Sequence, residues 1–105
     1  MRETLSKKDT LGNLGIKHGI FLGPMAGVTD LPYRLLCQEQ GCEMTFTEMV
    51  SAKGIYYNNK NTDELIAIDP QEKIVGLQLF GREPELMAEM AKRIDHSGIA
   101  CFDVN

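Results

Sequence analysis

The residues of this sequence that are best suited to chemistry lie in short segments at the ends of apolar runs. The first segment, residues 23–30, follows the apolar run 20–22 and has the sequence Gly-Pro-Met-Ala-Gly-Val-Thr-Asp. Glycine and proline hold a chain in a tight turn, and Gly and Ala let the backbone approach a flat ligand without obstruction. The segment predicts either a loop that contacts a ligand or a plain turn that caps the following helix.

A second candidate is Gln78, which lies inside the otherwise apolar run 74–80. A buried amide without partners costs roughly 1–3 kcal/mol, so its presence in this run needs an explanation. Its donor and acceptor suit the alternating edge of a uracil-like or flavin pyrimidine ring. The alternative is that Gln78 bonds neighbouring backbone or lies at the edge of a sheet.

The third candidate is the polar-apolar-polar end Asp103-Val104-Asn105. Side chains two residues apart on a strand share a face, so Asp103 and Asn105 would both point toward a ligand or both toward solvent. Glu48, at the end of another apolar run, has the same two interpretations.

Composition limits the class of protein. The chain has 105 residues, 43% hydrophobic and 25% charged, as is typical of one globular domain. A net charge of −4 and scattered basic residues give no electrostatic reason to expect nucleic acid on this segment. Three cysteines without a CxxC pair and a polar start indicate a cytoplasmic protein with reduced thiols and no membrane span. The two histidines lack partners at metal-ligand spacing, so no metal site is predicted.

The chemistry-bearing residues need elements that position them. Apolar runs alternate with amphipathic ones and predict parallel strands near 20–23, 43–47, 74–79 and 100–104, with helices near 31–40 and 84–95. The first helix would be capped by Thr29 or Asp30 and would carry an apolar stripe of Leu31, Leu35 and Leu36. The signal is weaker over 49–68, where we expect a helical turn at 51–57, a loop at 58–61 and a short helix at 63–68.

These elements predict an α/β fold in which helices cover a parallel sheet. Four parallel strands do not complete an eight-stranded barrel of roughly 250 residues, so the chain is either a small open α/β domain or part of a barrel. Residues 1–10 are expected to be a flexible lead-in, and residues 11–105 to form the domain.

Taken in order, these motifs resemble those of tRNA-dihydrouridine synthases over residues 12–105. The matching segments are Gly23-Pro-Met-Ala-Gly-Val-Thr-Asp30, Leu31-Pro-Tyr-Arg34, Phe46-Thr-Glu-Met49, Leu77-Gln-Leu-Phe-Gly81, Pro84 to Met87, and Asp103-Val-Asn105. The resemblance implies the N-terminal portion of a (β/α)8 TIM barrel that binds FMN and reduces uridine to 5,6-dihydrouridine in tRNA, with NADPH as the reductant.

The resemblance also implies roles for particular residues. Pro24, Met25 and Ala26 would lie against the isoalloxazine ring, Gln78 would bond its pyrimidine edge, and Asn105 would lie near the flavin and the substrate base. The family usually has Ala where this sequence has Gly23.

The remaining parts of the family's site are expected after Asn105. They include a proton-donating Cys in a Gly-Cys-Pro segment, the phosphate site and the tRNA-binding domain. The resemblance therefore implies that this chain alone is inactive, binds FMN weakly or not at all, and self-associates through unpaired strand edges. Two other interpretations are a fragment of an FMN barrel that acts on free pyrimidines, of the dihydroorotate or dihydropyrimidine dehydrogenase kind, and a non-catalytic, self-associating fragment.

Overall fold

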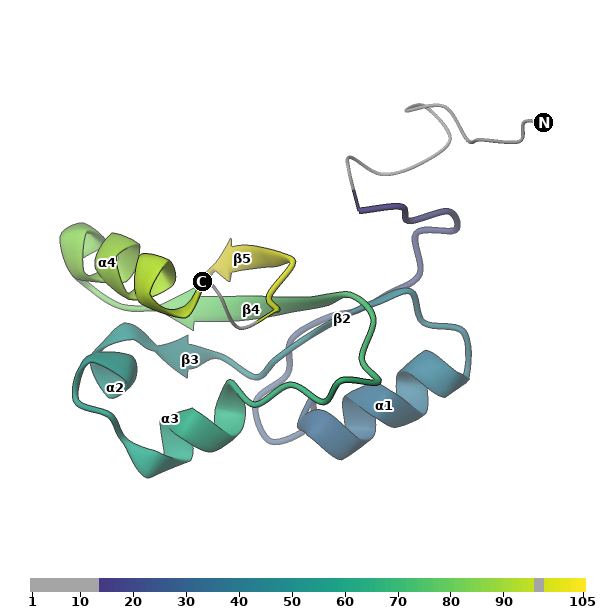
Figure 1. Ribbon diagram of the computed structural model, residues 1–105, viewed down its shortest axis with the longest axis horizontal. Coiled ribbons are helices and arrows are strands. Elements are labelled where there is room, and N and C mark those ends of the chain that lie inside the picture. The colour runs from purple at the N-terminus through teal and green to yellow at the C-terminus, as the bar shows by residue number, and fades with distance from the viewer. Residues whose placement is uncertain (1–13, 96–97) are drawn as a thin grey trace.

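The computed structural model describes residues 14–95 and 98–105, and Figure 1 shows the course of the chain. The described elements follow one another in the order β1 (Phe21–Leu22), α1 (Leu31–Glu39), β2 (Met44–Phe46), β3 (Val50–Ser51), α2 (Ala52–Tyr56), α3 (Lys60–Leu65), β4 (Val75–Phe80), α4 (Pro84–Ile94) and β5 (Cys101–Val104). The predicted lead-in at residues 1–10 lies outside the described residues.

Strand β4 is the centre of the sheet. One of its edges pairs with β5, and β2 and β3 follow one another along the other edge, with β1 beyond β2. All these pairs are parallel, and the arrowheads of β3, β4 and β5 point the same way in Figure 1. The predicted parallel strands and the two longer helices are therefore confirmed. This alternation of parallel strands and helices is the α/β architecture of part of a (β/α)8 barrel.

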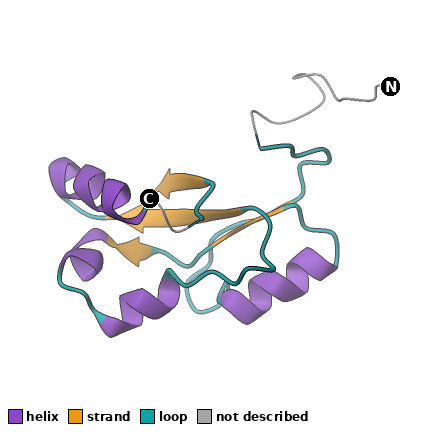
Figure 2. Cartoon of the chain, in the orientation of Figure 1, coloured by secondary structure: helices purple, strands orange, loops and turns teal. Residues whose placement is uncertain are grey.

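One face of β4 forms the hydrophobic core with α2 and α4, and Figure 2 shows the strands running between the helices. Leu77 and Leu79 are buried on this face and cluster with the buried side chains of Val50, Ala52, Ile55, Met90 and Ile94. Leu86, Met87 and Ala91 pack against the cluster, so the apolar face of α4 is turned toward the core. Burying each large side chain contributes about 1.5–3 kcal/mol.

The opposite face of β4 carries Gly76 and Gln78. A Cβ atom on Gly76 would lie 2.5 Å from the Phe46 ring and 3.1 Å from the Sγ of Cys101, so side chains of both neighbouring strands converge over this glycine. The register places Gln78 directly beside Asp103. The polar candidates of two strands therefore share a face away from the core.

Helix α1 begins and ends as the sequence predicts. Asp30 is the cap, and its Oδ1 accepts the N–H of Tyr33 at 3.0 Å. Pro32 lies in the first turn, where its missing N–H costs little. Gly41 follows the last turn with a φ of 105°, a left-handed conformation that favours glycine.

The predicted apolar stripe of α1 is wrong in part. Leu31 and Leu35 are half-buried, but Leu36 is 54% exposed. The buried residue of this helix is Arg34, which is only 2% exposed. Its guanidinium can be buried because its N–H groups donate to Glu72 and to the backbone carbonyls of Thr29 and Ala67.

The weak segment 49–68 also differs from its prediction. The helical turn expected at 51–57 is α2, but the strand β3 before it was not predicted. Helix α3 begins at Lys60, inside the expected loop, and ends at Leu65. The physical reason is Asn59, whose side chain accepts the N–H of Asn61 at 2.8 Å and caps the helix earlier.

A carboxylate fixes the backbone before β1 at the amino-terminal edge of the sheet. Glu43 accepts the N–H groups of Lys17 at 2.7 Å, His18 at 2.6 Å and Gly19 at 2.8 Å. These bonds lower the pKa of the Glu43 carboxyl below its ordinary value, and the bond from Lys17 contributes most to this shift. The start of β2 is thereby joined to the segment that leads into β1.

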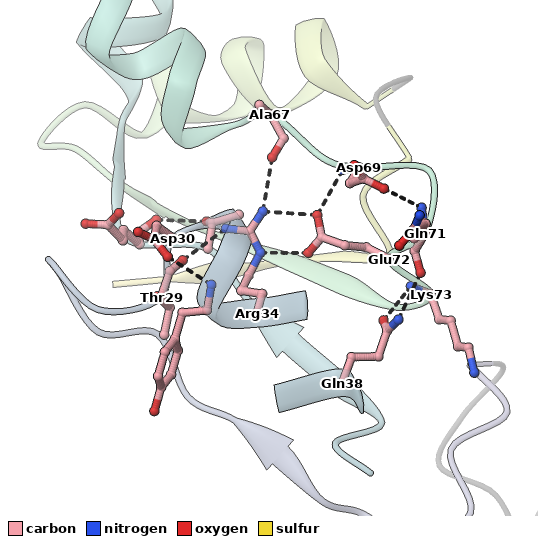
Figure 3. A network of polar contacts seen from close by, with 12 residues as sticks. Thr29, Asp30, Arg34, Gln38, Ala67, Asp69, Gln71, Glu72 and Lys73 are labelled. Atoms are coloured by element: carbon pink, nitrogen blue, oxygen red, sulfur yellow. Dashed lines mark hydrogen bonds and ion pairs between the residues drawn. The ribbon is translucent and has the colours of Figure 1, made fainter. Parts of the chain in front are cut away.

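A buried ion pair joins α1 to the segment before β4, as Figure 3 shows. The Nε of Arg34 donates to Glu72 Oε1 at 2.8 Å, and its Nη2 donates to Oε2 at 3.2 Å. The remaining donors reach the carbonyl oxygens of Thr29 and Ala67, both at 3.0 Å. Glu72 in turn accepts the N–H of Asp69 at 3.0 Å. The two charges are therefore desolvated together and fully paired.

We predict that Arg34→Met lowers the free energy of unfolding by about 3–5 kcal/mol, because it leaves the carboxylate of Glu72 buried without its partner. Urea denaturation measures the change. The double variant Arg34→Met with Glu72→Met should recover most of the loss, since it removes both charges. Arg82→Met, at an exposed arginine, is the control. A loss in the single variant no larger than in this control would contradict the prediction.

Candidate functional site

The candidate residues gather at the carboxyl-terminal edge of the sheet. Pro24, Met25 and Ala26 follow β1 directly, Gln78 lies in the second half of β4, and Asn105 follows β5. Because all the strands are parallel, these ends meet at the same edge, where α/β proteins place their ligands.

The loop after β1 is organised around the buried hydroxyl of Thr29. This Oγ1 donates to the carbonyl of Met25 at 3.3 Å and accepts its N–H at 3.2 Å. The backbone N–H groups of Val28 and Thr29 also donate to Met25, each at 3.0 Å. Met25 and Val28 nevertheless remain 42% and 40% exposed. The loop is therefore a tight turn that presents apolar side chains outward.

Strands β2 and β3 form one strand interrupted by a bulge. Phe46 pairs with Gly76 and Val50 pairs with Leu79, so three residues on the outer strand face two on β4. Bulges of this kind are uncommon between parallel strands, and they re-aim side chains beside functional sites. The extra residue lies within 47–49, the segment that carries Glu48.

The side chain of Thr47 supplies the hydrogen-bond acceptor that the ladder lacks at the bulge. The N–H of Thr47 donates to the carbonyl of Gly76 at 3.0 Å. In a regular parallel ladder, the N–H of Gln78 would then donate to the carbonyl of Thr47. Instead, Gln78 donates to Thr47 Oγ1 at 3.3 Å, and this hydroxyl donates to the carbonyl of Glu48 at 2.8 Å. A fully buried hydroxyl thus takes the place of a ladder carbonyl.

The bulge sends two successive side chains toward strands on opposite sides. Glu48 Oε1 accepts the N–H of Gly27 in the loop after β1 at 2.6 Å. The Sδ of Met49 lies 3.6 Å from the Nδ2 of Asn105, after β5. Met49 and Asn105 also line a cavity of about 350 Å³, together with residues that include Phe80, Gly81 and Arg82. The bulge therefore connects the loop after β1 to Asn105, after β5.

Gln78 is held by a carboxylate on the next strand. Its Nε2 donates to Asp103 Oδ2 at 2.8 Å, which fixes which end of the amide carries the oxygen. In the described part of the chain, the Oε1 of Gln78 accepts no hydrogen bond. The alternative in which the side chain bonds neighbouring backbone is not what the structure shows. An oriented acceptor is left on the face away from the core.

The thiols of two cysteines are poorly suited to acid-base chemistry here. Burial raises the pKa of Cys101, and the charge of Asp103 raises it further. Burial also raises the pKa of Cys42, which lies before β2 at the far edge of the sheet. Residues 14–95 and 98–105 contain no group of His, Cys, Asp or Glu that could hold a metal ion.

Sequence reasoning found the loop, Gln78 and the end of β5 but missed the bulge. The segment Phe46-Thr-Glu-Met49 matches a family motif, but the sequence predicts no separate role for Thr47 or Met49 and no partner for Glu48. The one available signal was the polar pair Thr47-Glu48 between apolar residues, which a bulge accommodates and a regular buried strand does not. Among the described helices, none has the length and apolar character that crossing a membrane requires.

The fold defines a parallel α/β protein of the barrel type, and its candidate site lies at the carboxyl-terminal edge of the strands. The family model for "Dihydrouridine synthase (Dus)" matches residues 21–105. The chain belongs to the dihydrouridine synthase family.

Curated relatives agree with this membership. A probable tRNA-dihydrouridine synthase of Treponema pallidum is 36% identical over 97 residues, which cover 91% of this chain and 28% of the relative. A tRNA-dihydrouridine synthase B of Vibrio parahaemolyticus is 33% identical, with 90% and 30% covered. A probable tRNA-dihydrouridine synthase 1 of Synechocystis is 34% identical, with 90% and 27% covered. The chain thus spans less than a third of the length of these relatives.

We predict that Thr47→Val lowers the free energy of unfolding by about 1–3 kcal/mol, because it leaves the buried N–H of Gln78 without an acceptor. Urea denaturation measures the loss. The matched control is Thr45→Val, at a buried threonine of β2, because the N–H of Gln78 is bonded by Thr47 and not by Thr45. Equal losses in the two variants would show that the hydroxyl of Thr47 does not support the bulge.

Proposed function

We propose that this chain is the N-terminal part of the FMN-binding barrel of an enzyme that reduces uridine to 5,6-dihydrouridine in tRNA, with NADPH as the reductant. Membership of the dihydrouridine synthase family supports the reaction. The observation that carries the proposal is the free acceptor of Gln78, oriented by Asp103 at the edge where the loop after β1 also ends.

The described residues fit a flat, partly polar ring such as that of FMN. A Cβ atom built on Gly23 or Gly27 meets no atom within 4 Å, so the loop backbone is open to a ligand. Met25 is 42% exposed although it is apolar, which leaves a surface for an aromatic ring to cover. Gln78 offers an acceptor and a second N–H to the polar edge of that ring.

In this proposal each residue has a binding or orienting role. Pro24, Met25 and Ala26 support the ring, Gln78 bonds its pyrimidine edge, and Asn105 lies beside the ring and the substrate base. FMN, when bound, supplies the hydride for reduction of the uracil. The chain's own residues hold the ring in place and shield it from water.

The proton for the other carbon of the uracil has to come from a general acid. The raised pKa values of Cys42 and Cys101, and their positions toward the amino-terminal ends of strands, argue against both thiols. From the resemblance to the family, we place the proton donor, a Cys, in the loop after β5, just beyond Asn105. We place the phosphate site and the main tRNA-binding surface in other parts of the enzyme, because the charge of this segment is −4.

The 105-residue chain alone is proposed to be inactive, to bind FMN weakly and to reside in the cytoplasm. The free cysteines, none of which forms a disulfide among the described residues, support a reducing compartment.

We predict that Gln78→Leu weakens FMN binding by the enzyme that contains this segment about tenfold or more, because the ring loses its polar partner. Flavin fluorescence measures binding, and NADPH-dependent reduction of unmodified tRNA measures activity. Gln71→Leu, at an exposed glutamine away from the strand ends, is the control. Unchanged binding in Gln78→Leu would contradict the role of this amide. Reduction of free uracil or free orotate in place of uridine in tRNA would favour the free-pyrimidine alternative.

We also predict that the 105-residue chain forms a dimer or higher oligomer. In the described sheet, the outer edges of β1 and β5 have no partner strand. Ile20 beside β1 is 56% exposed and Val104 in β5 is 70% exposed, so both edges carry uncovered apolar surface. Light scattering at micromolar concentration tests this, and a monomer would contradict it.

A further inference from the structure

We propose that Glu48 is a positioning residue for the cofactor loop, residues 23–28. Its carboxylate holds this loop in the conformation that meets the flavin ring. The inference rests on the proposed function, because it assumes that the loop binds FMN. It goes beyond that function because it assigns a role to a residue on a different strand that itself need not touch the ligand.

The first observation is the isolation of the loop. In the described part of the chain, residues 23–28 make one hydrogen bond to a segment beyond Thr29, and this is the bond from Gly27 N–H to Glu48 Oε1 at 2.6 Å. Bonds from backbone N–H groups to a carboxylate are short and about twice as strong as neutral ones. The φ of Gly27 is 77°, a conformation that costs glycine little and other residues more. The carboxylate therefore holds the turn at its left-handed glycine.

The second observation is the bulge between β2 and β3. Its extra residue lets Glu48 reach toward β1 while Met49 reaches toward Asn105, after β5. The buried hydroxyl of Thr47 bonds the carbonyl of Glu48 and so holds the backbone of the bulge. A solvated rim residue would not need this support. The structure thus shows a strand irregularity whose effect is to aim a carboxylate at the cofactor loop.

The physical consequence is preorganisation. A loop that is already in its bound conformation does not lose conformational entropy when the ligand binds. Without the carboxylate, the exposed side chains of Met25 and Val28 give the loop little packing that would restore the same conformation. Loss of Glu48 should therefore weaken FMN binding and change the environment of the flavin, while the core is unaffected.

The test compares Glu48→Ala and Glu48→Gln in the FMN-loaded enzyme that contains this chain. Flavin fluorescence gives the Kd for FMN, visible circular dichroism reports the surroundings of the ring, and hydrogen exchange reports the protection of the Gly27 amide. We expect Glu48→Ala to raise the Kd about tenfold or more, to alter the dichroism and to lower the protection. Glu48→Gln should stay within about threefold of the unsubstituted enzyme, because its amide oxygen still accepts from Gly27.

Glu43→Ala is the matched control. Glu43 also fixes a loop by accepting backbone N–H groups, those of Lys17, His18 and Gly19, but at the opposite edge of the sheet. Its loss should lower stability without a change in the Kd for FMN or in the dichroism. An equal effect of Glu43→Ala on FMN binding would mean that Glu48 acts only through general stability, and it would overturn the proposal.

The remaining outcomes separate this inference from the proposed function. If the unsubstituted enzyme binds FMN and Glu48→Ala binds it equally well, the positioning role is wrong and the proposed function stands. If Glu48→Gln binds as weakly as Glu48→Ala, an acceptor for the Gly27 amide is not sufficient to support FMN binding, which also overturns the positioning role. If the unsubstituted enzyme does not bind FMN, the proposed function and this inference both fail.

Discussion

The buried ion pair between Arg34 and Glu72 joins two segments that are 38 residues apart in sequence, and the candidate site depends on both. On one side, the guanidinium of Arg34 donates to the carbonyl of Thr29. The hydroxyl of the same Thr29 donates to the carbonyl of Met25 and so closes the turn after β1. On the other side, Glu72 lies in the segment that leads into β4, the strand that carries Gln78. Desolvating two charges is costly, and the cost is offset only when every remaining donor and acceptor is bonded. The network therefore fixes the loop after β1 relative to β4.

A second constraint comes from the bulge on the strand next to β4. In a regular strand, Glu48 and Met49 would point to opposite faces, and only one of them would reach the site. With the extra residue, Glu48 reaches toward β1 and Met49 toward β5. One backbone acceptor of the ladder is lost, and the hydroxyl of Thr47 accepts the N–H of Gln78 in its place. The core cluster on the other face of β4 is undisturbed, because Val50 returns to that face after the bulge. Stability and site geometry are thus built on opposite faces of the same strand.

The sequence could predict what depends on local pattern. The apolar runs located the longer strands, the capping of α1 by Asp30 followed from its side chain, and Gln78 stood out as an amide within an apolar run. It could not predict the burial of Arg34, because a leucine-rich helix has an alternative buried stripe and the arginine's partner lies far away in sequence. It could not predict the bulge either, since no glycine or proline marks residues 47–49. Whether Pro24, Met25, Ala26, Gln78 and Asn105 contact a ligand stays a prediction.

We propose that the carboxyl-terminal edge of the sheet holds the flavin. Hydrogen exchange of the enzyme that contains this chain, measured with and without FMN, tests it most directly. We expect FMN to slow exchange in the backbone segments 23–28 and 78–81, at the strand ends, and to leave the opposite edge at 41–43 and 98–100 unchanged. Slower exchange confined to the opposite edge, or no change at residues 23–28, would contradict the account.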